Sequence, residues 1–170
     1  MSEVEGELIR VPDVIGEVVG WRAWTVIAPH SAHPRLRSAN AARTVGLENA
    51  IWPTNRWMTA VCPRRGHELA DVPAVGCTCG LYAAAGLDQL LQYGYAQFAS
   101  DGVTVIGQVG FAGKVIPGTQ GWKAQRGRIV RLYVPLSQHE LGAKIARAYN
   151  VPFELATWWA TDPRLCGRGR

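Results

Sequence analysis

The feature that most constrains this chain is a loop that holds three of its four cysteines and a histidine. These residues follow the spacing Cys62-x4-His67-x9-Cys77-x-Cys79. Three thiolates and one imidazole make a complete tetrahedral ligand set for zinc. A Cys-x-Cys pair forms only a strained disulfide with itself, so chelation is the easier use of these two thiols. The spacing therefore predicts a structural zinc ion, and Gly80 allows the backbone to turn beneath the sulfur atoms.

Two other uses of this loop stay open, namely three buried thiols without a metal and a catalytic thiol. A closed shell of four protein ligands leaves no coordination position for water, which argues against catalysis. The His-x-Glu and Pro-Cys-x-x-Cys signature of zinc deaminases is absent from the sequence. Asp71 is the nearest substitute ligand for His67, and Cys166 near the C-terminus has no assigned role.

The start of the chain and its hydropathy favour an intracellular setting. The first residues, MSEVE, are acidic, whereas a secretory signal begins with basic residues. Purely apolar runs are only a handful of residues long, so we expect no membrane-spanning helix. A cytoplasm keeps thiols reduced, which favours metal binding by clustered cysteines over disulfide formation. We therefore expect a cytoplasmic protein of a bacterial host cell.

The pattern of apolar and β-branched residues predicts a single β-rich domain with two short helices. Strand-like segments come in runs, which favours an α+β domain with a bent, mostly antiparallel sheet or a small β-barrel. The predicted strands are 18–28, 36–38, 51–53, 57–62, 81–85, 103–115, 121–125 and 128–134. Helices are predicted over 87–98 and 137–150, and a capping box of Ser137 and Glu140 opens the second. Gly107, Gly110 and Gly113 predict a bend or bulge in the strand 103–115.

Charge and composition divide the chain into three parts. Residues 1–17 contain five acids and one base and are interpreted as an acidic N-terminal tail. Residues 18–158 are interpreted as the zinc-stapled α+β domain, and 159–170 as a basic C-terminal tail. The net charge of the whole chain is +5, so the chain beyond residue 17 carries +9.

The basic residues of the domain are concentrated in one acid-free stretch. No aspartate or glutamate occurs between Gly102 and His139. The cations of this stretch are Lys114, Lys123, Arg126, Arg128 and Arg131. A basic field of this kind favours polyanions, although a solvated basic surface without a partner has the same composition.

A short phrase occurs twice, as Gly20-Trp21-Arg22-Ala23 and as Gly121-Trp122-Lys123-Ala124. In a strand, Trp21 and Ala23 face one way and Arg22 and Trp24 the other. An exposed aromatic ring beside a cation is suited to stack a base and hold a phosphate. The alternative is that these tryptophans fill the core and that the cation lies over a ring at its rim.

Other chemistries find little support in the sequence. "GQVGFAGK" lacks the order of a phosphate-binding loop, and the sparse carboxylates form no convincing acid/base pair. His30 and His33 flank a loop and are more often solvated histidines than ligands. A hydrolase that uses the histidines stays open as a third alternative.

Several phrases together resemble a family of uncharacterised proteins from actinobacteria and their bacteriophages. They are "GWRAW" at 20–24, Trp52-Pro53, "GCTCGLYA" at 76–83, "GWKA" at 121–124, "LYV" at 132–134 and "IARAYNVP" at 145–152. The resemblance implies an intracellular actinobacterial or phage setting and supplies no established activity. Members typically have Trp-Gly and Glu-His in a later phrase, where this chain has Ala112-Gly113 and Pro117-Gly118. This departure favours a non-enzymatic role.

The sequence thus favours a zinc-stabilised binding domain over an enzyme. We expect it to bind nucleic acid or a nucleotide-like polyanion through the basic strands 114–131. The expected contact residues are Arg22, Lys114, Trp122, Lys123, Arg126, Arg128 and Arg131. The alternative is an interaction module that engages a host protein through exposed tryptophans.

Overall fold

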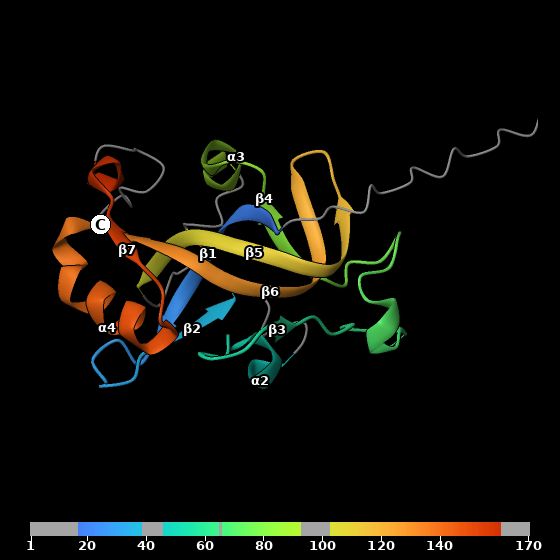
Figure 1. The fold of residues 1–170 in the computed structure, drawn as a ribbon, viewed down its shortest axis with the longest axis horizontal. Helices are drawn as coiled ribbons and strands as arrows, with labels where there is room; N and C mark the ends of the chain where they lie inside the picture. Colours follow the sequence, from blue (N-terminus) through green and yellow to red (C-terminus); the bar gives the residue numbers. More distant parts are fainter. Residues whose placement is uncertain (1–16, 39–45, 65, 93–102, 161–170) are drawn as a thin grey trace, which may run out of the picture.

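A long two-stranded hairpin forms the frame of the domain in the computed structural model (Figure 1). The structure describes residues 17–38, 46–64, 66–92 and 103–160. The hairpin consists of β5 (Thr104–Pro117) and β6 (Gly121–Val134), which pair antiparallel. Its register shifts twice, between Gln108 and Val109 and between Ala112 and Val115, so the predicted bend is confirmed. Gly113 lies in the second shift with a φ of 76°, a conformation that favours glycine.

Five further strands complete the sheet of the described chain. They are β1 (Val18–Ile27), β2 (Arg35–Ser38), β3 (Met58–Thr59), β4 (Leu81–Ala84) and β7 (Phe153–Leu155). β1 pairs with β2, β4 and β5, whereas β6 pairs with β3, β4, β5 and β7. All pairs are antiparallel except β6 with β7, so the sheet is mixed.

The α+β class with a bent sheet is confirmed, but the sheet is not a closed barrel. β1 and β4 pair through a single residue pair, Trp21 with Ala84, so the sheet curls toward itself there without forming a continuous strand ladder. The two strands predicted over 121–125 and 128–134 are one continuous strand. The sequence does not predict β7, because an alternation of apolar and polar residues cannot be recognised over only three residues.

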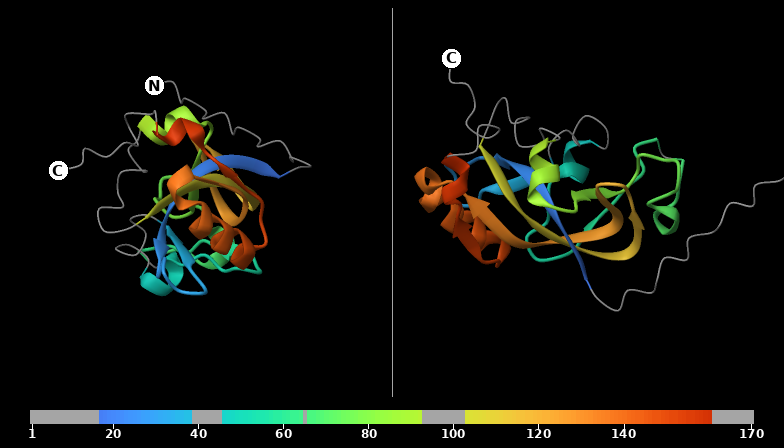
Figure 2. Two further views of the ribbon diagram at one scale, coloured as in Figure 1. Left: turned by 90° about the vertical axis from the view of Figure 1, so that its left-hand side faces the viewer. Right: turned by 90° about the horizontal axis from the view of Figure 1, so that it is seen from above.

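The described helices are short and lie on both sides of the sheet (Figure 2). The α-helices are α2 (Leu47–Ala50), α3 (Leu87–Gln92) and α4 (His139–Tyr149), and the 3-10 helices are η1 (Leu69–Asp71), η2 (Leu136–Gln138) and η3 (Thr157–Ala160). The helix predicted over 87–98 is confirmed up to Gln92, and its remainder lies outside the described residues. The predicted capping box is wrong: α4 begins at His139, and its N-cap Gln138 makes no side-chain cap hydrogen bond. Ser137 instead lies within η2.

Each face of the sheet covers its own hydrophobic core. The larger core contains Trp24 and Trp52 in edge-to-face contact at 5.4 Å, and α4 adds Ile145 and Tyr149. The smaller core lies beneath α3 and contains Ala23 and Leu90. β1 alternates between the two, as its sequence predicts, so both cores hold the same strand in place.

Candidate metal centre and the basic face of β6

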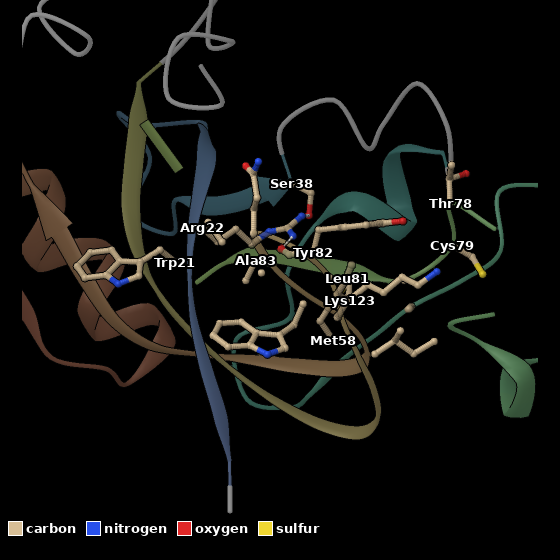
Figure 3. Close-up of a pocket in the computed structure, with 18 of the residues that line it drawn as sticks. Trp21, Arg22, Ser38, Met58, Thr78, Cys79, Leu81, Tyr82, Ala83 and Lys123 are labelled. Atoms are coloured by element: carbon tan, nitrogen blue, oxygen red, sulfur yellow. Dashed lines mark hydrogen bonds between the residues drawn. The ribbon is translucent and has the colours of Figure 1, made fainter. Parts of the chain in front are cut away.

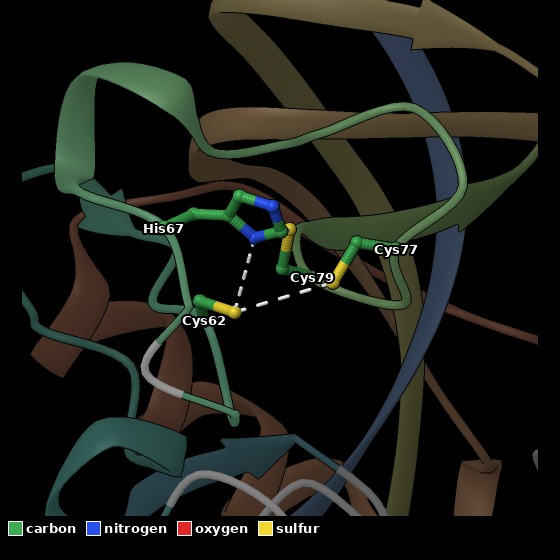
Figure 4. Close-up of side chains that lie close together, drawn as sticks. All are labelled: Cys62, His67, Cys77 and Cys79. Carbon is green, nitrogen blue, oxygen red and sulfur yellow. Dashed lines mark hydrogen bonds between the residues drawn. The ribbon is translucent and has the colours of Figure 1, made fainter.

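The four predicted metal ligands converge at one point (Figure 4). Their ligand atoms, three Sγ and one imidazole nitrogen, all lie within 4.8 Å of one another. Cys62 Sγ lies 3.3 Å from His67 Nδ1 and 4.0 Å from Cys77 Sγ, and Cys79 Sγ lies 3.9 Å from His67 Nδ1. The edges of a tetrahedron of sulfur atoms around zinc are about 3.8 Å long, so the donor set fits such an ion. His67, not Asp71, is the fourth member of the cluster.

Two short segments position these side chains. Cys62 follows β3, and backbone N–H groups of Arg64 and Gly66 point at its sulfur. The second segment bears Cys77 and Cys79, and the backbone N–H of Ala74 donates to Cys79 Sγ over 3.3 Å. Turns that aim N–H groups at sulfur are suited to thiolates, because a hydrogen bond to a charged acceptor is stronger than one to a neutral thiol.

Gly80 lets the second segment approach the sheet. Its φ of 126° lies in the region that L-residues avoid, and an added Cβ would lie 3.0 Å from Cβ of Pro73. The N–H group that bonds Cys79 belongs to Ala74 rather than to Gly80. Gly80 therefore provides the turn predicted for it.

The thiols have unequal acidity. Burial raises the pKa of Cys62, but hydrogen bonds from His67 and from two backbone N–H groups outweigh it and lower the pKa to about 6. Burial raises the pKa of Cys79, and the neighbouring thiols of Cys77 and Cys62 raise it further. Three thiolates repel one another at this distance, so full ionisation of the cluster requires a cation among them.

Lys123 of β6 fastens the loop to the sheet. Its Nζ donates to the carbonyl oxygens of Ala74 over 2.6 Å and of Cys77 over 2.9 Å. These carbonyls flank the turn that carries Cys77 and Cys79. Lys123, predicted as a polyanion contact, therefore lies beside the metal loop and supports it from behind.

Two cations of the predicted polyanion set meet on the outer side of β6. The guanidinium groups of Arg126 and Arg128 lie 5.8 Å and 5.2 Å from the ring centre of Trp57, which precedes β3. Arg128 also forms a bidentate ion pair with Glu17 at 2.7 and 3.0 Å. Both arginines are exposed, and we call Trp57, Arg126 and Arg128 the basic face.

The other predicted contact residues lie apart from the basic face. Lys114 is exposed on β5, and its Nζ lies 3.5 Å from the carbonyl oxygen of Asp71. Arg131 pairs with Glu154 of β7. The guanidinium of Arg22 lies 5.4 Å from the ring centre of Trp52 and donates to Ser38 Oγ and to the Tyr82 carbonyl. Trp122, half-buried, packs against the larger core.

Sequence reasoning missed Trp57 and Glu17 as members of this region. Trp57 reaches Arg128 because β3 pairs with β6. A strand of two residues has too short a sequence pattern to predict which strand it pairs with. Glu17 was assigned to the acidic tail, whose residues 1–16 lie outside the described part of the chain. The opposite charges of the N-terminal segment and of β6 were the one sequence signal that could have indicated the ion pair between Glu17 and Arg128.

The histidines outside the metal loop show no catalytic arrangement. A hollow of about 470 Å³ is lined by His30 and His139 together with Ser137 and Glu140. Within the described residues, no hydrogen bond joins that serine to either histidine, and His139 packs on Phe153 instead. The alternative of a hydrolase therefore gains no geometric support.

The tryptophan side chains that the structure describes do not form an exposed surface. Trp24 and Trp52 are buried, and the other tryptophans whose side chains the structure describes are half-buried. Trp21 stacks on Tyr133 at 5.1 Å, which in turn contacts Trp158. Cys166 lies outside the described residues, and no described helix is long and apolar enough to cross a membrane.

Comparison with known proteins leaves the chain without an assigned relative. No protein-family model matches it, and neither the curated proteins nor the solved structures gave a match. The resemblance to actinobacterial and phage proteins therefore stays a prediction.

Proposed function

We propose that this protein is a zinc-stabilised domain that binds nucleic acid through the basic face of β6. The metal part rests on the donor set, because thiolates with one imidazole in a tetrahedral arrangement favour zinc over harder cations. The cluster uses four protein ligands, which suits a structural ion. When bound, the ion supplies a positive charge that allows all three cysteines to ionise.

The binding part rests on one observation: the exposed guanidinium groups of Arg126 and Arg128 both lie against the indole ring of Trp57. Cations that border an aromatic ring on a strand can neutralise phosphates while the ring offers a surface to bases. The chain beyond residue 17 carries +9, so the surrounding field also attracts a polyanion. Single-stranded nucleic acid is the polyanion class that uses both features.

Glu17 occupies part of this face. Its carboxylate neutralises Arg128, and the bidentate pair raises the pKa of that guanidinium. Both side chains remain accessible, with 56% of the Arg128 side chain exposed. An exposed pair of this kind contributes little to stability, so a phosphate can replace the carboxylate at low cost.

Fluorescence anisotropy with labelled single-stranded DNA and RNA tests the proposal at two salt concentrations. We expect binding at low salt that weakens as salt rises, with a slope reduced by about 1.4 in the double variant Arg126→Ala/Arg128→Ala. Arg131→Ala is the matched control, because Arg131 lies apart from the basic face, beside Glu154 of β7, and we expect this variant to bind like the parent. No binding at low salt, or equal losses in both variants, would contradict the proposal.

The interaction-module alternative has less support. It relies on exposed tryptophans, and none is found among the tryptophan side chains that the structure describes. A pull-down from actinobacterial lysate in the presence of nuclease separates the two functions. A partner that is lost on nuclease treatment agrees with nucleic-acid binding.

A further inference from the structure

The two copies of the Gly-Trp-cation-Ala phrase lie close together in the structure, apart from the basic face. They lie in β1 and β6, and β4 pairs with both strands. A Cβ on Gly20 would lie 2.7 Å from Cβ of Ala83, and one on Gly121 would lie 2.0 Å from the Ala83 carbonyl oxygen. Both glycines therefore permit a close approach to the same residue of β4. The two phrases are brought together by this contact.

The tryptophan and the cation of both copies line one pocket (Figure 3). The pocket has a volume of about 570 Å³, within the range of about 300–1,000 Å³ that holds small organic ligands. Its walls are the metal loop at Thr78–Gly80, the turn of the β5–β6 hairpin, and apolar side chains that include Met58 and Leu90. Trp21 is held in place by its stack on Tyr133.

The charges of the pocket select the sign of its ligand. Arg22 and Lys123 line it, and no aspartate or glutamate is present among its described lining residues. Lys123 donates two hydrogen bonds to neutral carbonyls, which leave its charge in place and one N–H of the ammonium available. Arg22 is fixed by its bonds to Ser38 and to the Tyr82 carbonyl, so its charge is pre-positioned at the pocket wall.

We propose that this pocket binds a small organic anion that carries a planar aromatic ring. The ring packs against the indoles of Trp21 and Trp122, and the anionic group lies toward Lys123 and Arg22. Aromatic stacking and a charge-assisted hydrogen bond supply the affinity, and the apolar wall excludes water. The site is separate from the basic face and does not depend on nucleic-acid binding.

Isothermal titration calorimetry of the zinc-loaded full chain with 1-naphthoate tests the site. We expect 1-naphthoate to bind with a Kd of about 1 mM or tighter. The cationic analogue 1-naphthylmethylammonium is expected to bind at least about tenfold more weakly, because it meets two positive charges. Octanoate tests the ring, and we expect it to bind more weakly than 1-naphthoate. Absence of 1-naphthoate binding, or equal binding of the cationic analogue, would overturn the proposal.

Variants locate the ligand within the pocket. Lys123→Met with saturating zinc is expected to weaken 1-naphthoate binding about tenfold, the loss of one charge-assisted bond. Tyr82→Ser, at a position that is 46% exposed, perturbs the pocket edge without removing a core side chain, and we expect a loss of several-fold. Leu136→Ser is the control, since Leu136 is 67% exposed and does not line this pocket.

The two proposals fail independently. Arg126→Ala/Arg128→Ala is expected to leave 1-naphthoate binding unchanged, because neither arginine lines the pocket. Loss of 1-naphthoate binding in that double variant, with Tyr82→Ser unaffected, would place the anion on the basic face and contradict the pocket.

Discussion

The metal loop and the basic face are organised in opposite ways. In the loop, four side chains point inward at one another and are held by backbone N–H groups. On the basic face, two exposed guanidinium groups lie against one tryptophan ring. The loop gathers groups that repel when ionised, so it depends on a bound cation. The basic face is carried by paired strands, so it depends on the sheet alone.

The largest expected effect that separates the two regions comes from Cys79→Ser. Loss of a buried ligand should abolish stable zinc binding. A metal at a thousand times its Kd stabilises a fold by about 4 kcal/mol, which corresponds to about 8–16 °C in Tm for a chain of this size. Differential scanning fluorimetry measures the change, with Cys166→Ser as the matched cysteine control. A variant that keeps the parent Tm would show that the loop does not staple the fold.

The acidity of Cys62 distinguishes a preformed loop from one that the metal assembles. In metal-free protein the pKa of Cys62 is lowered from 9.0 to about 6, so alkylation by iodoacetamide should rise with a midpoint near pH 6. Folding lowers this pKa, so the thiolate stabilises the metal-free fold above about pH 9, and the contribution disappears as the pH falls through 6. Mass spectrometry after timed alkylation reads each cysteine separately. An alkylation midpoint of Cys62 near the ordinary thiol value of 9.0 would contradict a preformed loop.

Lys123→Met tests the link between loop and sheet. Removal of the ammonium frees the carbonyls of Ala74 and Cys77, so we expect zinc affinity to fall by about 10–100-fold, as for other outer-shell contacts. Competition with a chromophoric chelator measures the affinity. Lys114→Met is the matched lysine control, because Lys114 Nζ lies 3.5 Å from the carbonyl oxygen of Asp71 and, among the described residues, makes no hydrogen bond to the turn that carries Cys77 and Cys79. Equal losses in both variants would indicate a general charge effect.

The smallest expected effect concerns Glu17→Gln. Release of Arg128 should strengthen oligonucleotide binding by about two- to fivefold, the range that corresponds to an exposed ion pair. Anisotropy titration at low salt measures the gain, and Glu154→Gln serves as the control because it releases Arg131 instead. A gain of the same size in the control would mean that net charge, not the basic face, sets the affinity.

The sequence predicted the metal ligands best, because few residue types can bind zinc. Clustered cysteine and histidine residues have few alternative uses, so the spacing alone could group Cys62 and His67 with Cys77 and Cys79. The long strands were found because the alternation in β1 and the bend in β5 leave strong patterns. The helix over 137–150 was found, but its start was misplaced, because Ser137 forms a 3-10 turn instead of a cap.

The partners of the charged side chains could not be predicted from the sequence. Lys123 and Arg126 are three residues apart in one strand, yet one supports the metal loop and the other borders Trp57. Which partner a cation meets depends on strand pairing between β6 and its neighbours. The curl that joins Gly20 to Gly121 around Ala83 is likewise a tertiary contact, although the repeated phrase marked both places.

Metal content tests the central claim most directly. Native mass spectrometry of the full chain, purified without added metal, should find one zinc ion per chain. Treatment with a strong chelator should remove that ion and expose three alkylatable cysteines at 62, 77 and 79. A well-folded protein that carries no zinc, or that keeps its zinc in Cys79→Ser, would contradict the Cys62–His67–Cys77–Cys79 centre.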